Sequence, residues 1–162
     1  LAPGPMSGLW LRDQRDTGDP PGMENAAKYL PLPLHIRDNL YVHIVPLADW
    51  ERFVEWVTPL ARMRPYRTAD LGGGLIPNIW DCGSYTRFFI GRAYEWAPSP
   101  ACGWVELHSP RGTPHVMNWL LAEEGGAPRL WYWDGTPRNV VSWTPDNLFT
   151  DLQGWTLERL GF

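Results

Sequence analysis

Residues 78–96 read NIWDCGSYTRFFIGRAYEW, a pattern that predicts a helix with a cysteine in its first turn, because aromatic and apolar residues recur at helical spacing. Asp81 can cap this helix, since its carboxylate can accept hydrogen bonds from the free N–H groups of the first turn. Residues 71–77 contain three glycines and a proline, which predicts a loop before the helix. A thiol at Cys82 would therefore lie at the positive end of the helix dipole, which favours the thiolate.

Cys82 has two interpretations on this evidence. A single cysteine in an apolar setting is usually a small buried hydrophobic residue. A cysteine at the start of a helix, behind a glycine-rich loop, can instead be a nucleophile. The residues downstream favour the nucleophile.

His115 begins a strand-like run over residues 115–122, and Asp134 ends another over residues 129–134. If the loop 123–128 joins two antiparallel neighbours, the start of the first strand lies beside the end of the second. A carboxylate beside an imidazole can fix its tautomer, and the imidazole can then activate a thiol. The sequence therefore predicts a triad of cysteine, His115 and Asp134.

Two alternatives to this triad stay open. His108 ends a predicted strand over residues 102–108 and is a rival for the base. We prefer His115, because it precedes a longer apolar strand and pairs with the Asp134 end. Asn118 could replace Asp134 as the orienting group, although strand alternation places it on the face opposite to His115.

Four further residues are candidates for the rest of the site. An oxyanion would be stabilised by the cysteine backbone N–H and one upstream donor, for which Asn78 and the Trp80 indole are candidates. Asn78 equally has the character of a turn residue after a proline. Trp131 and Trp133 would either wall the site or belong to the core of the sheet.

The order of these residues resembles the papain-like superfamily, in which a cysteine on a helix precedes a histidine on a strand and an aspartate at the end of the next strand. The motifs that carry the resemblance are Trp80-Asp81-Cys82, His115-Val116-Met117-Asn118 and Trp133-Asp134. They look most like the papain-like domain at the C-terminus of certain fungal agglutinins and its phage-encoded relatives. The resemblance covers residues 39–162; those relatives often carry an acidic or amide residue soon after the cysteine, where this chain has Gly83-Ser84.

The resemblance implies a cysteine hydrolase, a thiol protease or amidase that cleaves a peptide or amide bond in a peptide or protein substrate. It also allows a bound calcium ion, although no acidic loop of suitable spacing supports one and the sequence predicts no metal site. The alternative is a non-catalytic structural or binding module on a papain-like scaffold, such as a virion assembly protein or a carbohydrate-binding protein.

The predicted fold is α+β and papain-like, with the cysteine helix packed on a mainly antiparallel sheet of four to five strands. The clearest other helix spans residues 48–63, where an apolar stripe recurs at helical spacing. Asp49 is its predicted cap, and Pro59 is expected to kink it or split it in two.

Shorter elements are predicted on either side of this framework. Residues 40–45 read as a strand with His43 on a surface or at a rim, and residues 155–160 read as a final strand. Thr144-Pro145 predicts the start of a brief helix through residue 151.

Residues 1–34 read as an extended arm rich in proline and glycine, and residues 35–162 as a single domain. The arm is either a disordered tail or a segment that docks to another chain, with Trp10 as its anchor.

Composition excludes several classes of protein. The net charge is −4 without a basic run, so nucleic acid is not an expected partner. No apolar run is long enough to span a bilayer and no signal peptide is visible, which predicts a soluble protein and leaves its compartment open. Cys82 and Cys102 could form a disulfide in an oxidising compartment, but their spacing does not require it.

Overall fold

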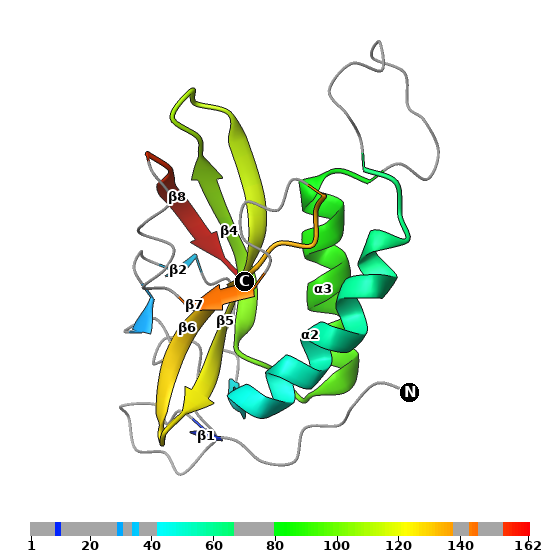
Figure 1. The fold of residues 1–162 in the computed structure, drawn as a ribbon. Helices are drawn as coiled ribbons and strands as arrows, with labels where there is room; N and C mark the ends of the chain where they lie inside the picture. Colours follow the sequence, from blue (N-terminus) through cyan, green and yellow to red (C-terminus); the bar gives the residue numbers. More distant parts are fainter. Residues whose placement is uncertain are drawn as a thin grey trace.

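A computed structural model describes residues 9–10, 29–30, 34–35, 42–66, 80–137, 143–145 and 154–162. Over these residues the chain is α+β, with two helices packed on a mixed sheet of five strands that is extended by three shorter ones (Figure 1). The helices are α2 (Leu47–Arg62) and α3 (Cys82–Trp96). The five strands are β3 (His43–Pro46), β4 (Cys102–His108), β5 (Pro114–Glu124), β6 (Ala127–Trp133) and β8 (Thr156–Gly161). The short strands are β1 (Leu9–Trp10), β2 (Leu34–His35) and β7 (Trp143–Pro145).

Strand β5 is the centre of the sheet. Along one edge it pairs first with β4 and then with β3, while β6 pairs with the other edge from Asn118 onward. The β5–β6 hairpin turns at Gly125 and Gly126, which both have positive φ. The pairs β4–β5, β5–β6 and β4–β8 are antiparallel, and the pairs β3–β5 and β2–β8 are parallel. The longest strand pairs are therefore antiparallel, within a sheet that is mixed overall.

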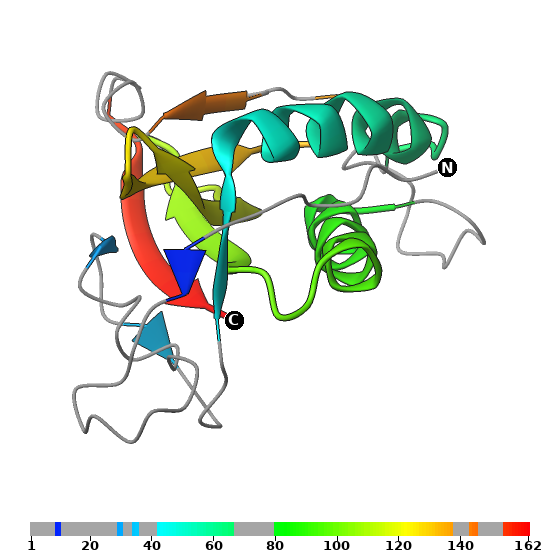
Figure 2. The same ribbon diagram turned by 90° about the horizontal axis from the view of Figure 1, so that it is seen from below.

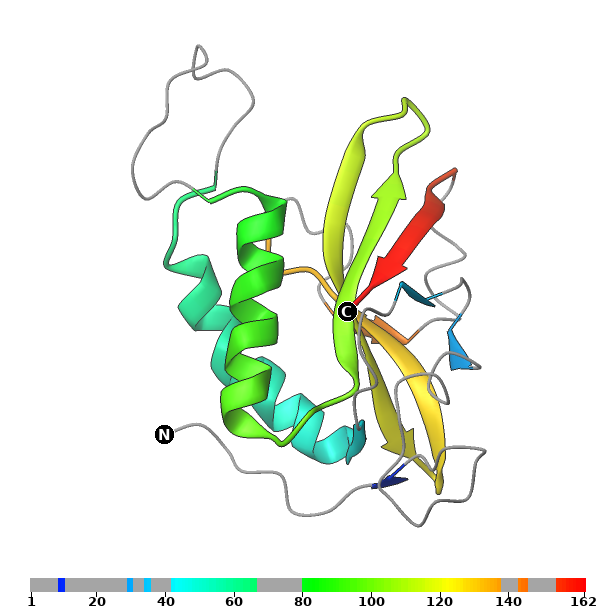
Figure 3. The same ribbon diagram turned by 180° about the vertical axis from the view of Figure 1, so that it is seen from behind.

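Both helices lie on the same face of the sheet (Figures 2 and 3). Leu120 and Ala122 of β5 face them, in a cluster that holds most of the buried aromatic rings. Phe89 of α3 lies at its centre, with ring centroids 5.3 Å from Phe53 and 4.6 Å from Trp133. The apolar stripes of the two helices thus determine how α3, and the residue at its start, is placed against β5.

The opposite face of the sheet is also buried. Trp119 and Leu121, which alternate with the helix-facing residues of β5, belong to a second apolar cluster with Tyr132 of β6 and Leu160 of β8. With apolar residues on both faces, β5 reads as a nearly continuous hydrophobic run.

The helix predicted from Cys82 to Trp96 is confirmed at both ends, and so is the strand over residues 102–108. The antiparallel hairpin predicted from His115 is also confirmed, although its loop is shorter than residues 123–128. The predicted final strand corresponds to β8.

Two details of the predicted helix over residues 48–63 are wrong. Asp49 does not cap it, because α2 begins two residues earlier, after Pro46; the Asp49 side chain is buried and pairs with Arg52. Of the two effects expected of Pro59, the split is wrong, because α2 continues through this proline to Arg62.

His43 is not a surface or rim residue: it is only 6% exposed. The prediction assumed a strand with one solvated face, but β3 lies between β1 and β5 and its neighbours Val42 and Ile44 are buried as well. Burial lowers the pKa of the His43 imidazole.

The predicted helix start at Thr144-Pro145 is also wrong. Both residues lie in β7, where they pair with Tyr132 and Trp131 of β6. Residues 146–151, the rest of that predicted helix, lie outside the described part of the chain.

Most of the predicted arm, residues 1–34, lies outside the described residues. Its described parts contact the rest of the chain. β1 pairs with β3, and β2, which ends at His35, pairs with β8. Tyr29 and Leu30 pack against the second apolar cluster.

Candidate active site

Cys82 is the first residue of α3 because Asp81 caps the helix. Asp81 Oδ1 accepts a hydrogen bond from the Ser84 backbone N–H at 2.8 Å, and Ser84 Oγ accepts one from the Asp81 N–H at 3.4 Å. This reciprocal capping box fixes the first turn. Cys82 is half-buried and free, at the positive end of the helix dipole.

His115 and Asp134 meet at the open edge of β5. The pairing of β6 with β5 ends at Trp133, opposite Asn118, so the next residue, Asp134, is free to reach His115. His115 Nε2 lies 2.8 Å from Asp134 Oδ2, and each side chain is 1% exposed. The other carboxylate oxygen, Oδ1, accepts a 2.9 Å hydrogen bond from the Thr136 N–H. Both oxygens of Asp134 are therefore held.

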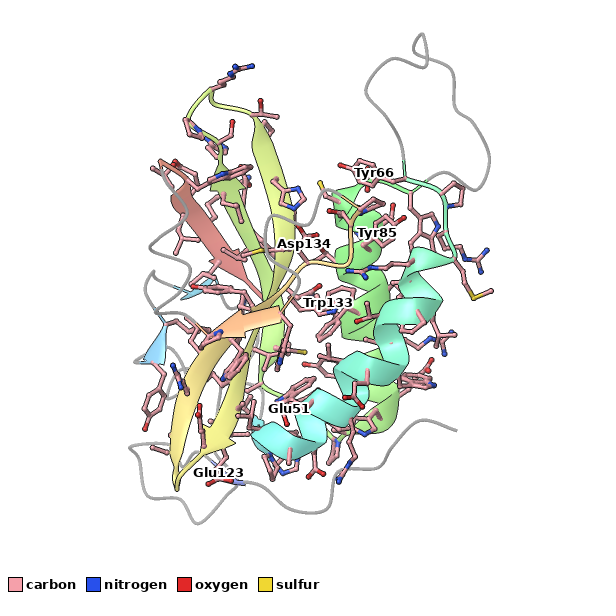
Figure 4. All side chains as sticks on the ribbon, viewed as in Figure 1. Glu51, Tyr66, Tyr85, Glu123, Trp133 and Asp134 are labelled. Atoms are coloured by element: carbon pink, nitrogen blue, oxygen red, sulfur yellow. The ribbon has the colours of Figure 1, made fainter. Side chains whose placement is uncertain are left out.

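Figure 4 shows where this pair lies relative to the helices. Asp134 and Trp133 lie between the sheet and the helices, and Tyr85 lies on α3 near its N-terminal end. The first turn of α3 and the end of β6 therefore converge on the same side of the sheet.

The Cys82 thiol and the His115 imidazole shift each other's pKa. Burial tends to lower the pKa of His115, but its hydrogen bond with Asp134, its interaction with Cys82 and the charge of Asp134 raise it to about 9. Burial tends to raise the pKa of the Cys82 thiol, but interaction with His115 and the Val116 backbone N–H lowers it overall. Both shifts favour a proton on the imidazole and a thiolate on Cys82.

Only one of the two ring nitrogens of His115 is available to the Cys82 thiol. Asp134 occupies Nε2, which leaves Nδ1 for the thiol. Nδ1 is buried and makes no hydrogen bond of normal geometry with any described residue. Catalytic hydrogen bonds are often long or poorly aligned before substrate binds, so Nδ1 and the thiol can act as a pair without such a bond.

The two sequence alternatives for the triad have other partners. His108 Nε2 lies 3.1 Å from Glu106, and its Nδ1 lies 3.8 Å from Glu158, on the exposed part of β4 and β8. Asn118 donates from Nδ2 to the carbonyl oxygens of Thr86 and Gly103. Thus the structure brings His115, rather than His108, to Asp134, and Asn118 is not the group that orients His115.

The tryptophans predicted around the site have different positions. The Trp80 ring packs on Tyr85 and Phe88, with centroids 5.2 and 5.3 Å away. Trp133 is 1% exposed, and its Nε1 donates to Thr58 Oγ1 at 3.0 Å, so it is a core residue between sheet and helices.

Trp131 stacks on Trp143 of β7, with ring centroids 4.5 Å apart. It pairs with Leu120, five residues along β5 from His115, which is about 17 Å at roughly 3.4 Å per residue. The structure therefore does not bring Trp131 to the triad. Asn78 lies outside the described residues.

Three contacts of the site had no role in the sequence prediction. The Trp155 ring lies edge-on to His115, with centroids 6.3 Å apart. Nothing local to Trp155 signals this contact, and the backbone of Val116 has no side-chain signature. Thr136 could have been found, because an aspartate that accepts the N–H two residues later is a common turn motif.

The remaining observations concern cysteine pairing, metals and membranes. Cys102 is a free, fully buried thiol on β4, and burial raises its pKa far above the ordinary value. Among the described residues, no group of three or more His, Cys, Asp or Glu side chains could hold a metal ion. Neither described helix is long and apolar enough to cross a membrane.

The chain matches no protein-family model, no curated protein and no solved structure. Its function is therefore inferred from the geometry of Cys82, His115 and Asp134.

Proposed function

We propose that this protein is a papain-like cysteine hydrolase that cleaves a peptide or amide bond. The observation that carries the proposal is the arrangement of three residues. Asp134 holds one nitrogen of a buried His115, and the imidazole interacts with a thiol at the start of a capped helix. An activated nucleophile, its base and the group that orients the base need such an arrangement, which supports the proposal.

The proposed reaction begins with attack by Cys82 Sγ on the carbonyl carbon. A C–S bond forms and the C=O electron pair moves onto oxygen. The imidazolium of His115 then gives its Nδ1 proton to the leaving nitrogen, the C–N bond breaks, and a thioester remains. His115 next removes a proton from water, which attacks the thioester carbon. A C–O bond forms, the C–S bond breaks, and the carboxylic acid leaves, which restores the Cys82 thiolate and the His115 imidazolium. Asp134 stays charged and holds the imidazole throughout.

The developing oxyanion needs hydrogen-bond donors. The first N–H groups of a helix have no partner within it, so the Cys82 N–H at the start of α3 is suited to this role. Asn78 or the Trp80 indole remains the proposed second donor. The ring contacts of Trp80 with Tyr85 and Phe88 favour Asn78.

The resemblance to the papain-like domains of fungal agglutinins and phage relatives supports the same assignment. In the described chain, the cysteine begins a helix packed on the sheet, the histidine lies on the central strand, and the aspartate directly follows the neighbouring strand. By this resemblance the substrate is a peptide, with the peptide amides of bacterial cell walls as a narrower class.

The proposal is tested by release of new primary amines from a denatured protein and from a cell-wall stem peptide. Wild-type protein is expected to release amines from at least one substrate, and Cys82→Ala from neither. A Cys102→Ala variant serves as the matched control and should retain activity. If neither substrate releases amines, or if Cys82→Ala releases them as wild-type protein does, the proposal is contradicted and a non-catalytic binding module is favoured.

A further inference from the structure

We propose that Asn118 is a positioning residue that sets how the Cys82 turn sits against His115. The inference rests on the proposed function, because it assigns a role within the same site. Asn118 lies on β5 three residues after His115 and is fully buried. Its side chain joins the strand that carries the histidine to the helix that carries the cysteine.

One amide group connects three elements of the fold. Asn118 Nδ2 donates to the Thr86 carbonyl on α3 at 3.2 Å and to the Gly103 carbonyl on β4 at 3.0 Å. Both partners are acceptors, so the nitrogen and not the oxygen of the amide must point toward them. Each donor hydrogen is thus used, one along the sheet and one across to the helix.

The helix contact lies one turn from the nucleophile. Thr86 is four residues after Cys82, and its Oγ1 donates to the Cys82 carbonyl at 2.9 Å. Holding the Thr86 carbonyl against β5 therefore limits both the sliding and the rotation of the first turn of α3. The same turn must bring the thiol to His115 and to the Val116 N–H, which are also on β5.

The hydrogen bond from Asn118 to β4 is made to a closely packed part of the backbone. A Cβ atom added to Gly103 would meet the Gly161 carbonyl oxygen and would lie 2.8 Å from the Trp119 indole nitrogen. The backbone of Gly103 is therefore closely packed, and its carbonyl is a fixed reference point for the amide. Apolar packing such as that of Phe89 on Trp133 attracts the helix without fixing direction, whereas a hydrogen bond constrains both distance and angle.

Stability alone does not explain why position 118 is an asparagine. Asn118 Oδ1 is buried and accepts no hydrogen bond from any described residue. Buried polar atoms are normally partnered, and the desolvation cost of this unpaired oxygen offsets part of what the two donated bonds contribute to stability. An amide with one unsatisfied atom in a core is better explained by the geometry that its two donated bonds impose.

The test is the pH dependence of Cys82 alkylation by iodoacetamide in Asn118→Leu, which keeps the size of the side chain and removes its donors. We expect the midpoint to rise by about one pH unit toward that of an ordinary thiol, which lowers the labelling rate about tenfold at a pH below the wild-type midpoint. Asn118→Ser, which is too short to reach both carbonyls, should shift it in the same direction and keeps the test valid if the leucine variant does not fold.

Trp50→Phe is the matched control. Trp50 Nε1 donates to the Leu121 carbonyl at 3.1 Å, a buried bond that joins α2, not α3, to β5. This variant loses a comparable bond and should leave the Cys82 midpoint unchanged. A purely structural role for Asn118 would make the two variants behave alike.

The outcomes separate this inference from the proposed function. If alkylation of Cys82 in the wild-type protein has the pH midpoint of an ordinary thiol, the proposed function itself is contradicted. A depressed midpoint in the wild type that stays the same in folded Asn118→Leu and Asn118→Ser would overturn only the role of Asn118. A depressed midpoint that rises in both, and not in Trp50→Phe, would support it.

Discussion

Replacing Asp134 by asparagine should make the stability of the protein depend less on pH. The substitution keeps the shape of the side chain and an oxygen for the Thr136 N–H, but removes the charge beside His115. Without that charge, burial favours the neutral imidazole, so the pKa of His115 should fall from about 9 toward or below its ordinary range.

The size and direction of the effect follow from the linkage between proton binding by His115 and folding. A histidine with a pKa raised to about 9 in the folded chain stabilises the fold fully below its unfolded pKa of about 6.5. This contribution is lost as the pH rises through the folded value. At 1.36 kcal/mol per pKa unit the linkage is worth about 3 kcal/mol. Asp134 is the larger of the two partners that raise this pKa, ahead of Cys82. Asp134→Asn should therefore lower the free energy of unfolding by about 2–3 kcal/mol at pH 6 and by much less above pH 9.

Denaturation by urea at several pH values between 6 and 9.5 measures this difference directly. Asp49→Asn is the matched control, because Asp49 is also buried but pairs with Arg52, which keeps its charge over this range. Its destabilisation should be nearly independent of pH. If Asp134→Asn also destabilised the fold equally at pH 6 and pH 9.5, the charge coupling between Asp134 and His115 would be refuted.

Three further predictions concern other parts of the framework. In native protein, Cys102 should resist alkylation even at pH 9, because burial raises its pKa, and it should label only after unfolding; labelling at the rate of a free thiol would contradict this. Asp81→Ala should lower the free energy of unfolding by about 1 kcal/mol through loss of the helix cap, whereas Asp81→Asn should lose little; equal losses in urea melts would rule out capping as the cause. Phe89→Ala should cost about 3–5 kcal/mol, since its ring is fully buried between α2 and Trp133; a loss below 1 kcal/mol would show that this core is not packed as described.

Features set by near neighbours in the sequence were predictable. Asp81 and Ser84 cap α3 through contacts three residues apart, and the helical spacing after Cys82 continues until Trp96. The approach of His115 to Asp134 was also predictable, because a single hairpin places the two strand ends side by side.

Errors arose where tertiary contacts overrode a local signal. His43 was expected at a surface, but both faces of β3 are covered, which depends on residues far away in the sequence. Thr144 and Pro145 have the signature of a helix start and yet pair with β6. Asn118 reaches partners 32 and 15 residues away, so no local pattern reveals its contacts.

The most direct test of the central claim is the pH dependence of alkylation at Cys82, read by mass spectrometry separately from Cys102, in wild-type protein and in His115→Ala. We predict rapid labelling of Cys82 with a midpoint well below about 8.5, the ordinary value for a thiol. We also predict that His115→Ala raises this midpoint, because burial then acts on the thiol without the imidazole to oppose it. Slow labelling of Cys82, with the same pH dependence in both proteins, would contradict an activated thiolate–imidazolium pair and with it the assignment as a hydrolase.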